Sequence, residues 1–83
     1  MGVEDYKRIL SEQGGRCAVC GTDKPGGHGS FHVDHDHETS AVRGLLCGKC
    51  NMGLGLLGDN PKQAAERLWK YAEATELYLD YAI

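Results

Sequence analysis

The sequence predicts a small α+β fold of 83 residues, in which helices at both ends flank a metal-clamped β-hairpin. Three observations predict this fold. Two Cys-x2-Cys pairs enclose a glycine-rich segment, that segment contains two short apolar runs, and the residues after Pro61 follow a helical period. We expect a single domain over residues 1–83 with a core at about 15–58. A core of this size contributes only about 3–5 kcal/mol, whereas a structural zinc contributes about 10–16 kcal/mol.

The N-terminal part of the chain predicts a short helix followed by a loop. Val3 to Glu12 is amphipathic, with Val3, Tyr6, Ile9 and Leu10 on one face. Gly14-Gly15 should end this helix, because glycine readily adopts the positive φ of a helix C-terminus. Residues 21–30 contain Pro25 and several glycines without periodicity, so we expect a loop there.

The middle of the chain predicts a β-hairpin and a short helix. Phe31 to Asp36 and Val42 to Leu46 are strand-like, and turn-forming residues 38–40 lie between them. The spacing of Met52, Leu54, Leu56 and Leu57 favours a short helix after the second cysteine pair.

The clearest helix should run from about 61 to 81. Asn60 can cap it and Pro61 suits its first turn. Two apolar stripes follow the helical period, and we interpret the tyrosine stripe as core packing or a dimer contact. The first stripe contains Ala65, Leu68, Ala72, Thr75 and Leu79, and the second contains Tyr71, Ala74, Tyr78 and Tyr81.

Four cysteines, Cys17, Cys20, Cys47 and Cys50, have the spacing of a tetrahedral zinc site. Four thiolates saturate zinc and leave no open position for water, so this site should be structural. Two C-x2-C pairs in a reducing compartment favour a metal over disulfides, and we expect a cytoplasmic protein. The sequence shows no membrane-spanning stretch and no signal-peptide pattern.

A second group of polar side chains lies between the cysteine pairs and just beyond them. His32, His35 and His37 alternate with Asp34 and Asp36 over six residues, and Asn51 follows Cys50 directly. Within a zinc-clamped hairpin these groups favour a second, open metal site over a solvated polar edge. Asp34 and His35 would point to opposite faces of a regular strand, so a shared site requires the strand to end, bulge or twist there.

The segments 31–37, 42–47 and 50–51 resemble the recombination endonuclease VII family, which belongs to the HNH, ββα-metal or His-Me finger, group of nucleases. The similarity covers about residues 6–75. It implies a hairpin followed by a helix that together hold one divalent cation against a scissile phosphate. It also implies that Cys17, Cys20, Cys47 and Cys50 bind structural zinc.

The resemblance assigns a role to each candidate. It implies that Asp34 and Asn51 bind the cation, that His35 is the general base, and that His37 positions the phosphate or its neighbours. No histidine follows Asn51 on the helix, so this asparagine is the one candidate ligand that the helix offers to the cation. Carboxylate and amide oxygens suit Mg²⁺ or Mn²⁺, and a neutral imidazole near pH 7 can accept a proton from water.

The leading interpretation is therefore an HNH endonuclease that nicks DNA, one strand per active site, as a monomer or weak homodimer of phage type. The alternative is a non-catalytic zinc module that binds DNA or protein; a thiol redox protein is a more distant third.

The net charge of −3 disfavours tight binding to nucleic acid by charge alone. Arg43 and Lys49 are either phosphate contacts or ordinary surface, His28 and His32 have no assigned role, and Asp36 is either a hydrogen-bond acceptor for a histidine or solvated.

Overall fold

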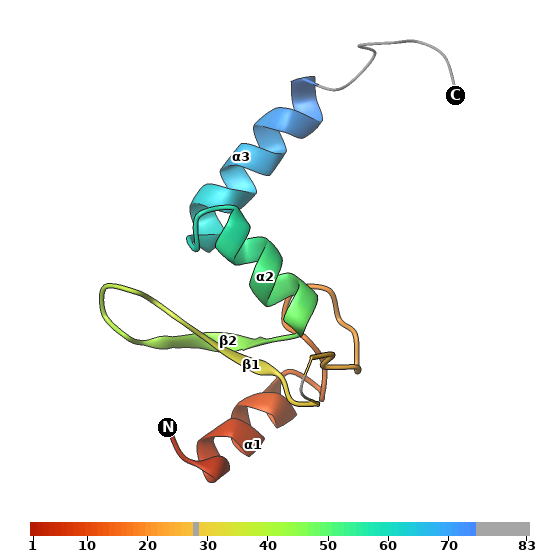
Figure 1. Ribbon diagram of the computed structural model, residues 1–83, viewed down its shortest axis with the longest axis vertical. Coiled ribbons are helices and arrows are strands. Elements are labelled where there is room, and N and C mark those ends of the chain that lie inside the picture. Colours follow the sequence, from red (N-terminus) through yellow and green to blue (C-terminus); the bar gives the residue numbers. More distant parts are fainter. Residues whose placement is uncertain (28, 75–83) are drawn as a thin grey trace. The chain divides into compact units, whose positions relative to one another are not determined.

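The computed structural model describes residues 1–27 and 29–74, which form a small α+β structure (Figure 1). Its two strands form one antiparallel sheet. The chain divides into two compact units, Met1–Gly53 and Leu54–Ile83, and the expected single domain stays a prediction. No helix within the described ranges is long and apolar enough to cross a membrane. The elements are α1 (Val3–Glu12), β1 (His32–His35), β2 (Val42–Leu46), α2 (Gly48–Leu56) and α3 (Pro61–Ala74).

Helix α1 begins and ends as the sequence predicts. Near its start, the Asp5 carboxylate accepts a hydrogen bond of 3.1 Å from the backbone N–H of Gly2. Gly14 and Gly15 follow its end with φ of 68° and 74°, a conformation that L side chains rarely adopt. The N–H of Gly15 donates to the carbonyl of Leu10 at 2.8 Å, which closes the last turn.

One face of α1 connects the helix to the hairpin. Tyr6, Ile9 and Leu10 are half-buried, whereas Val3, which we expected on the same face, is exposed at the first position of the helix. The Tyr6 hydroxyl accepts a hydrogen bond of 2.9 Å from the backbone N–H of Phe31. This bond fixes the entry to β1 relative to α1.

Gln13, the residue after α1, pairs with the outer edge of β2. Its Oε1 accepts from the backbone N–H of Leu45 at 2.9 Å, and its Nε2 donates to the Leu45 carbonyl at 3.0 Å. Nε2 also donates to the carbonyl of Arg16 at 2.8 Å. The side-chain amide thus replaces a neighbouring strand and covers the sheet edge beside the fully buried Leu45.

We expect Gln13→Ala to lower the free energy of unfolding by about 1–3 kcal/mol, because it leaves part-buried backbone groups of Leu45 without these partners. Urea unfolding of the zinc-loaded protein measures this loss. Gln13→Glu is the companion variant: it keeps an acceptor for the Leu45 N–H but places a carboxylate oxygen against the carbonyls of Leu45 and Arg16, so it should also be less stable than the parent. An alanine variant as stable as the parent would show that this pairing contributes nothing.

The hairpin contains an irregularity at the point where the candidate residues lie. His32 pairs with Leu46, Asp34 with Gly44, and His35 with Val42, so the register shifts between Asp34 and His35. Arg43 is therefore the extra residue of a β-bulge in β2. Strand β1 also ends at His35, one residue before the expected end at Asp36, and it begins at His32 rather than Phe31.

Asp36 stabilises the hairpin turn. Its Oδ1 accepts hydrogen bonds from the backbone N–H groups of Glu38 (2.8 Å) and Thr39 (3.0 Å). These bonds, with that of Thr39 the largest contribution, lower the pKa of the Asp36 carboxyl below its usual value. Ser40 completes the turn with a φ of 64°. Asp36 thus has a structural role in the turn, and its contact with a histidine stays a prediction.

The core of the first unit is small and includes two cysteines. Leu45 is fully buried at 0 % exposure, and its neighbours in the core are Phe31, Leu46, Cys17 and Cys47. Three large apolar side chains are few for a folded unit, which agrees with the expected need for a metal.

Helix α2 confirms the short helix expected after β2. Its first residue is Gly48, so Cys50 and Asn51 lie within its first turn. The backbone N–H of Gly48 donates to the carbonyl of Pro25 at 2.9 Å, which holds the loop of residues 21–27 beside the start of the helix.

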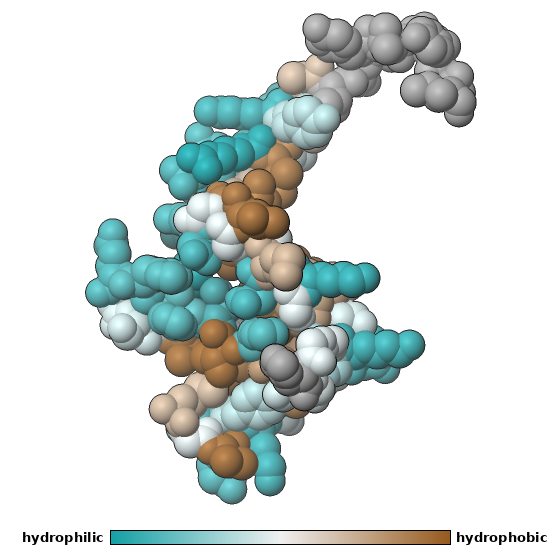
Figure 2. All heavy atoms as spheres, viewed as in Figure 1, coloured by the Kyte–Doolittle hydropathy of each residue, from teal (hydrophilic) through white to brown (hydrophobic). Residues whose placement is uncertain are grey.

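In the second unit, α3 begins as predicted. The Asn60 side chain accepts a hydrogen bond of 2.9 Å from the N–H of Gln63, and Pro61 is the first helical residue. Ala64 is the buried residue of this helix, whereas Ala65, Leu68 and Ala72 of the expected face are exposed. Figure 2 shows apolar surface on this helix. Tyr71 is exposed too, which rules out core packing for it, and Thr75, Tyr78, Leu79, Tyr81 and the helix end near 81 lie outside the described residues.

Candidate active site and metal centre

The four cysteines converge on one point. One sulfur from each lies within 4.8 Å of the other three, and all four are free thiols. The Sγ atoms of Cys20 and Cys47 are 3.7 Å apart. A zinc tetrahedron with Zn–S bonds of about 2.3 Å has S–S edges of about 3.8 Å, so the thiols fit this ion.

Each pair forms a tight turn in which backbone N–H groups face sulfur. The N–H of Val19 donates to Cys17 Sγ at 3.4 Å, and the N–H of Cys50 donates to Cys47 Sγ at 3.5 Å. The second turn is the junction between β2 and α2, so the cysteine cluster connects the hairpin, the helix and the loop after α1.

The pKa values within the cluster diverge, as expected for thiols crowded around one point. Burial raises the pKa of the Cys17 thiol, but hydrogen bonds from the backbone of Cys47, Cys20 and Val19 outweigh burial and lower it to about 6. Burial and the three neighbouring thiols raise the pKa of Cys50 to about 12. A divalent cation at the centre favours the thiolate at every position, because its charge offsets the repulsion among the sulfurs.

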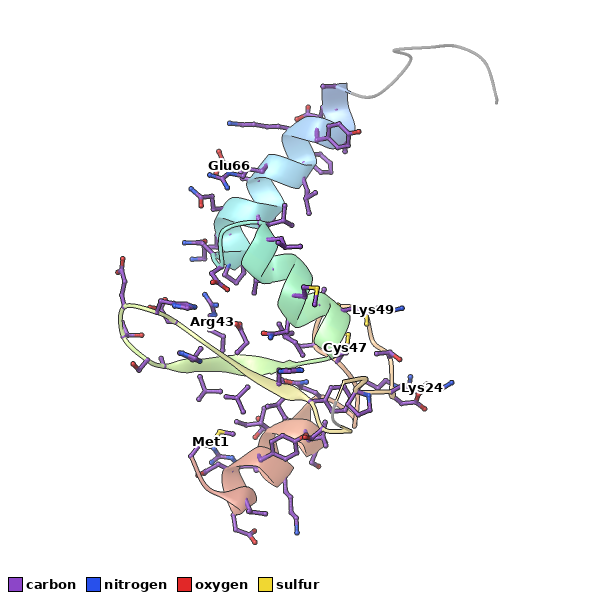
Figure 3. All side chains as sticks on the ribbon, in the orientation of Figure 1. Met1, Lys24, Arg43, Cys47, Lys49 and Glu66 are labelled. Carbon is purple, nitrogen blue, oxygen red and sulfur yellow. The ribbon has the colours of Figure 1, made fainter. Side chains whose placement is uncertain are left out.

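On the hairpin, the Asp34 carboxylate pairs with Arg43. Arg43 Nε lies 2.8 Å from Asp34 Oδ2, and Arg43 Nη2 lies 2.8 Å from Asp34 Oδ1. Among the residues that the structure describes, Asp34 is the one charged residue that is buried, with 8 % exposure. Arg43, which the sequence suggested as a phosphate contact or ordinary surface, thus contacts the expected metal ligand. Figure 3 shows Arg43 on the hairpin, whereas Lys24 and Lys49 lie near Cys47.

The structure brings two of the candidate histidines together. The rings of His35 and His37 stack with centroids 5.3 Å apart and an angle of 21° between their planes. Both residues are exposed, at the end of β1 and in the following turn. Exposed imidazoles beside a buried carboxylate are accessible to a large substrate.

Asn51 lines an open groove of about 860 Å³ beside the cysteine cluster. Other polar side chains of this groove come from Thr22, Lys24, His32 and Lys49. His32 Nε2 lies 3.7 Å from the position that a Cβ would take at Gly27 or at Gly48, so its ring packs against both glycines. His32 therefore lies at the groove, next to the metal cluster.

The second metal site that the sequence predicts depends on oxygen donors. Within residues 1–27 and 29–74, the cysteine quartet is the one group of three or more His, Cys, Asp or Glu side chains arranged to hold a metal. The histidines and aspartates of the hairpin do not form such a group. Asp34 and Asn51 offer one carboxylate and one amide oxygen, a donor set that suits a hydrated Mg²⁺ or Mn²⁺.

Sequence reasoning missed the Asp34–Arg43 pair and the pairing of Gln13 with β2. The first had a signal, since opposite charges at adjacent positions of a hairpin attract each other. The second had none, because a glutamine beyond a helix end does not indicate which strand it will contact.

Comparison with known proteins gives a consistent result. The sequence profile of the recombination endonuclease VII family matches residues 1–74. The Gene 59 protein of Mycobacterium phage D29 is 50 % identical over 49 residues, and that of Mycobacterium phage L5 is 48 % identical over 48 residues. These matches cover 59 % and 58 % of this chain, respectively, and 29 % of each phage protein.

Proposed function

Because the chain belongs to the recombination endonuclease VII family, we propose that it is a metal-dependent endonuclease that hydrolyses phosphodiester bonds in DNA. As an HNH-type enzyme with one active site, it nicks one strand at a time, as a monomer or weak homodimer. The two phage relatives support a phage-like origin. The chain spans less than a third of their length, so this proposal concerns the domain and not a junction-resolving assembly.

The end of β1 beside the bulge is the observation that supports this proposal most directly. A regular strand would direct Asp34 and His35 to opposite faces, and a shared site requires the strand to end, bulge or twist there. Strand β1 ends at His35, and the partner strand β2 carries the extra residue Arg43 opposite the step from Asp34 to His35, so the regular ladder does not continue past this point. A zinc module that only binds a partner has no need for such an irregularity.

Each residue has a physical role in the proposed reaction. Asp34 and Asn51 would hold Mg²⁺ or Mn²⁺, which supplies positive charge to the phosphate and the leaving oxygen. His35 accepts the proton of the attacking water, because an exposed imidazole nitrogen can reach that water and act as a general base. His37 stacks on His35 and limits its rotation. The four cysteines bind structural zinc.

Supercoiled plasmid DNA incubated with the protein and Mg²⁺ or Mn²⁺ tests the proposal. We expect conversion to open circles that depends on the added cation. Asp34→Ala and Asn51→Ala should raise the metal concentration needed for half-maximal nicking by about 10-fold or more, because each removes one of two protein ligands.

Lys24→Ala serves as the matched control, since it changes another exposed polar residue of the groove and removes no oxygen ligand. Its metal requirement should equal that of the parent. Failure to cut DNA with Mg²⁺, Mn²⁺, Co²⁺ or Ni²⁺ would favour the alternative, a zinc module that binds DNA or protein without cleaving it.

A further inference from the structure

The contact between Arg43 and Asp34 occupies the carboxylate that the proposed function assigns to the cation. Both oxygens of Asp34 accept a hydrogen bond of 2.8 Å from the guanidinium. Side-chain exposure is 22 % for Arg43 and 10 % for Asp34. A two-bond contact between charged groups that are this shielded is strong and directional.

Local backbone geometry explains why these two residues meet. Asp34 lies opposite Gly44 in the register of the hairpin, and the next residue of β1, His35, lies opposite Val42. Arg43, between these two residues of β2, is the extra residue of the bulge. A bulge redirects a side chain relative to the regular alternation, which brings Arg43 to the carboxylate.

A buried, ionised carboxylate is strongly stabilised by a positive partner, and in the proposed function two cations are available to Asp34 in turn. One is the guanidinium of Arg43. The other is the divalent cation of the proposed reaction. Both cations favour the same oxygens, and each weakens the binding of the other through charge repulsion.

We propose that Arg43 is an exchangeable counter-ion: it holds Asp34 until the divalent cation binds, and its released guanidinium then contacts a DNA phosphate. This inference rests on the proposed role of Asp34 as a metal ligand. The planar guanidinium suits both partners, because carboxylate and phosphate present the same pair of acceptor oxygens. Arg43 is thus a positioning residue whose two contacts couple metal binding to DNA binding.

Direct measurement of Mn²⁺ binding tests the exchange without reference to activity. The electron paramagnetic resonance signal of free Mn²⁺ gives the dissociation constant for the zinc-loaded full chain in the absence of DNA. We expect Arg43→Gln to bind Mn²⁺ about fivefold or more tightly than the parent, because the competing charge is gone. Arg43→Lys, which keeps the charge but loses the two-bond contact, should tighten binding about twofold.

A second measurement tests whether the guanidinium of Arg43 contributes to DNA binding. Fluorescence anisotropy of a labelled duplex, in saturating Mn²⁺ and in a His35→Ala background to suppress cleavage, reports DNA affinity. Arg43→Gln should weaken DNA binding about three- to tenfold, and the loss should shrink as salt is raised. Zinc content and far-UV circular dichroism verify the fold of each variant. If Arg43→Gln does not fold, Arg43→Lys is compared with the parent in its place.

The outcomes separate the two ideas. If Arg43→Gln, or Arg43→Lys in its place, binds Mn²⁺ no more tightly than the parent while Asp34→Asn loses Mn²⁺ binding, the exchange is wrong and the metal role of Asp34 stands. If Asp34→Asn binds Mn²⁺ as well as the parent, the proposed metal site itself is wrong and the exchange falls with it. Tighter Mn²⁺ binding together with weaker DNA binding supports the exchange.

Discussion

Removal of zinc should unfold the first unit of the protein. The cysteine cluster connects the loop after α1, the end of β2 and the start of α2, and two of its four members are among the few buried side chains. A structural zinc contributes about 10–16 kcal/mol of apparent binding free energy, more than the whole stability of a typical small domain. Far-UV circular dichroism during titration with a strong chelator should therefore show loss of the hairpin and α1 together.

A pair of variants separates loss of metal from loss of a side chain. Cys47→Ser removes a buried ligand and should purify without zinc and without a cooperative unfolding transition. Cys20→His replaces an exposed ligand with another zinc donor, so it should keep one zinc per chain and the fold. A chelated protein that still unfolds cooperatively, with unchanged circular dichroism, would show that the metal is dispensable.

Local signals in the sequence predicted most of the framework correctly. The spacing of the cysteines, the glycine pair after α1 and the cap at Asn60 each depend on residues a few positions apart. Such signals can be read without knowledge of the fold. The hairpin, too, follows from two apolar runs with turn residues between them.

The features that sequence reasoning missed are non-local or depend on what covers a surface. The extra residue in β2 is defined by the register between strands, and this determines that Arg43 reaches Asp34. Gln13 contacts Leu45, which lies 32 positions away. In α3 the periodicity identified residues that share a face, but periodicity does not show whether another element covers that face, and Leu68 is exposed.

Replacement of His35 should have the largest effect on activity. His35→Ala removes the proposed general base, and the loss of such a group lowers rates by about 10²- to 10⁴-fold. The residue is exposed and ends β1, so its side chain contributes little to the core. We therefore expect plasmid nicking in Mn²⁺ to fall by at least about 100-fold while zinc content and circular dichroism stay unchanged.

Control variants on the same hairpin distinguish chemistry from local structure. Val42→Ala changes the cross-strand partner of His35 without removing a polar group, and its nicking rate should stay within about twofold of the parent. His37→Phe keeps a ring to stack on His35 but removes both nitrogens, so a modest loss would indicate a packing role and a large loss a role at the phosphate. Normal nicking by His35→Ala would exclude this histidine as the base. Because Asp34 and His35 are consecutive residues of β1 opposite the bulge of β2, such a result would also remove the proposed functional reason for that irregularity.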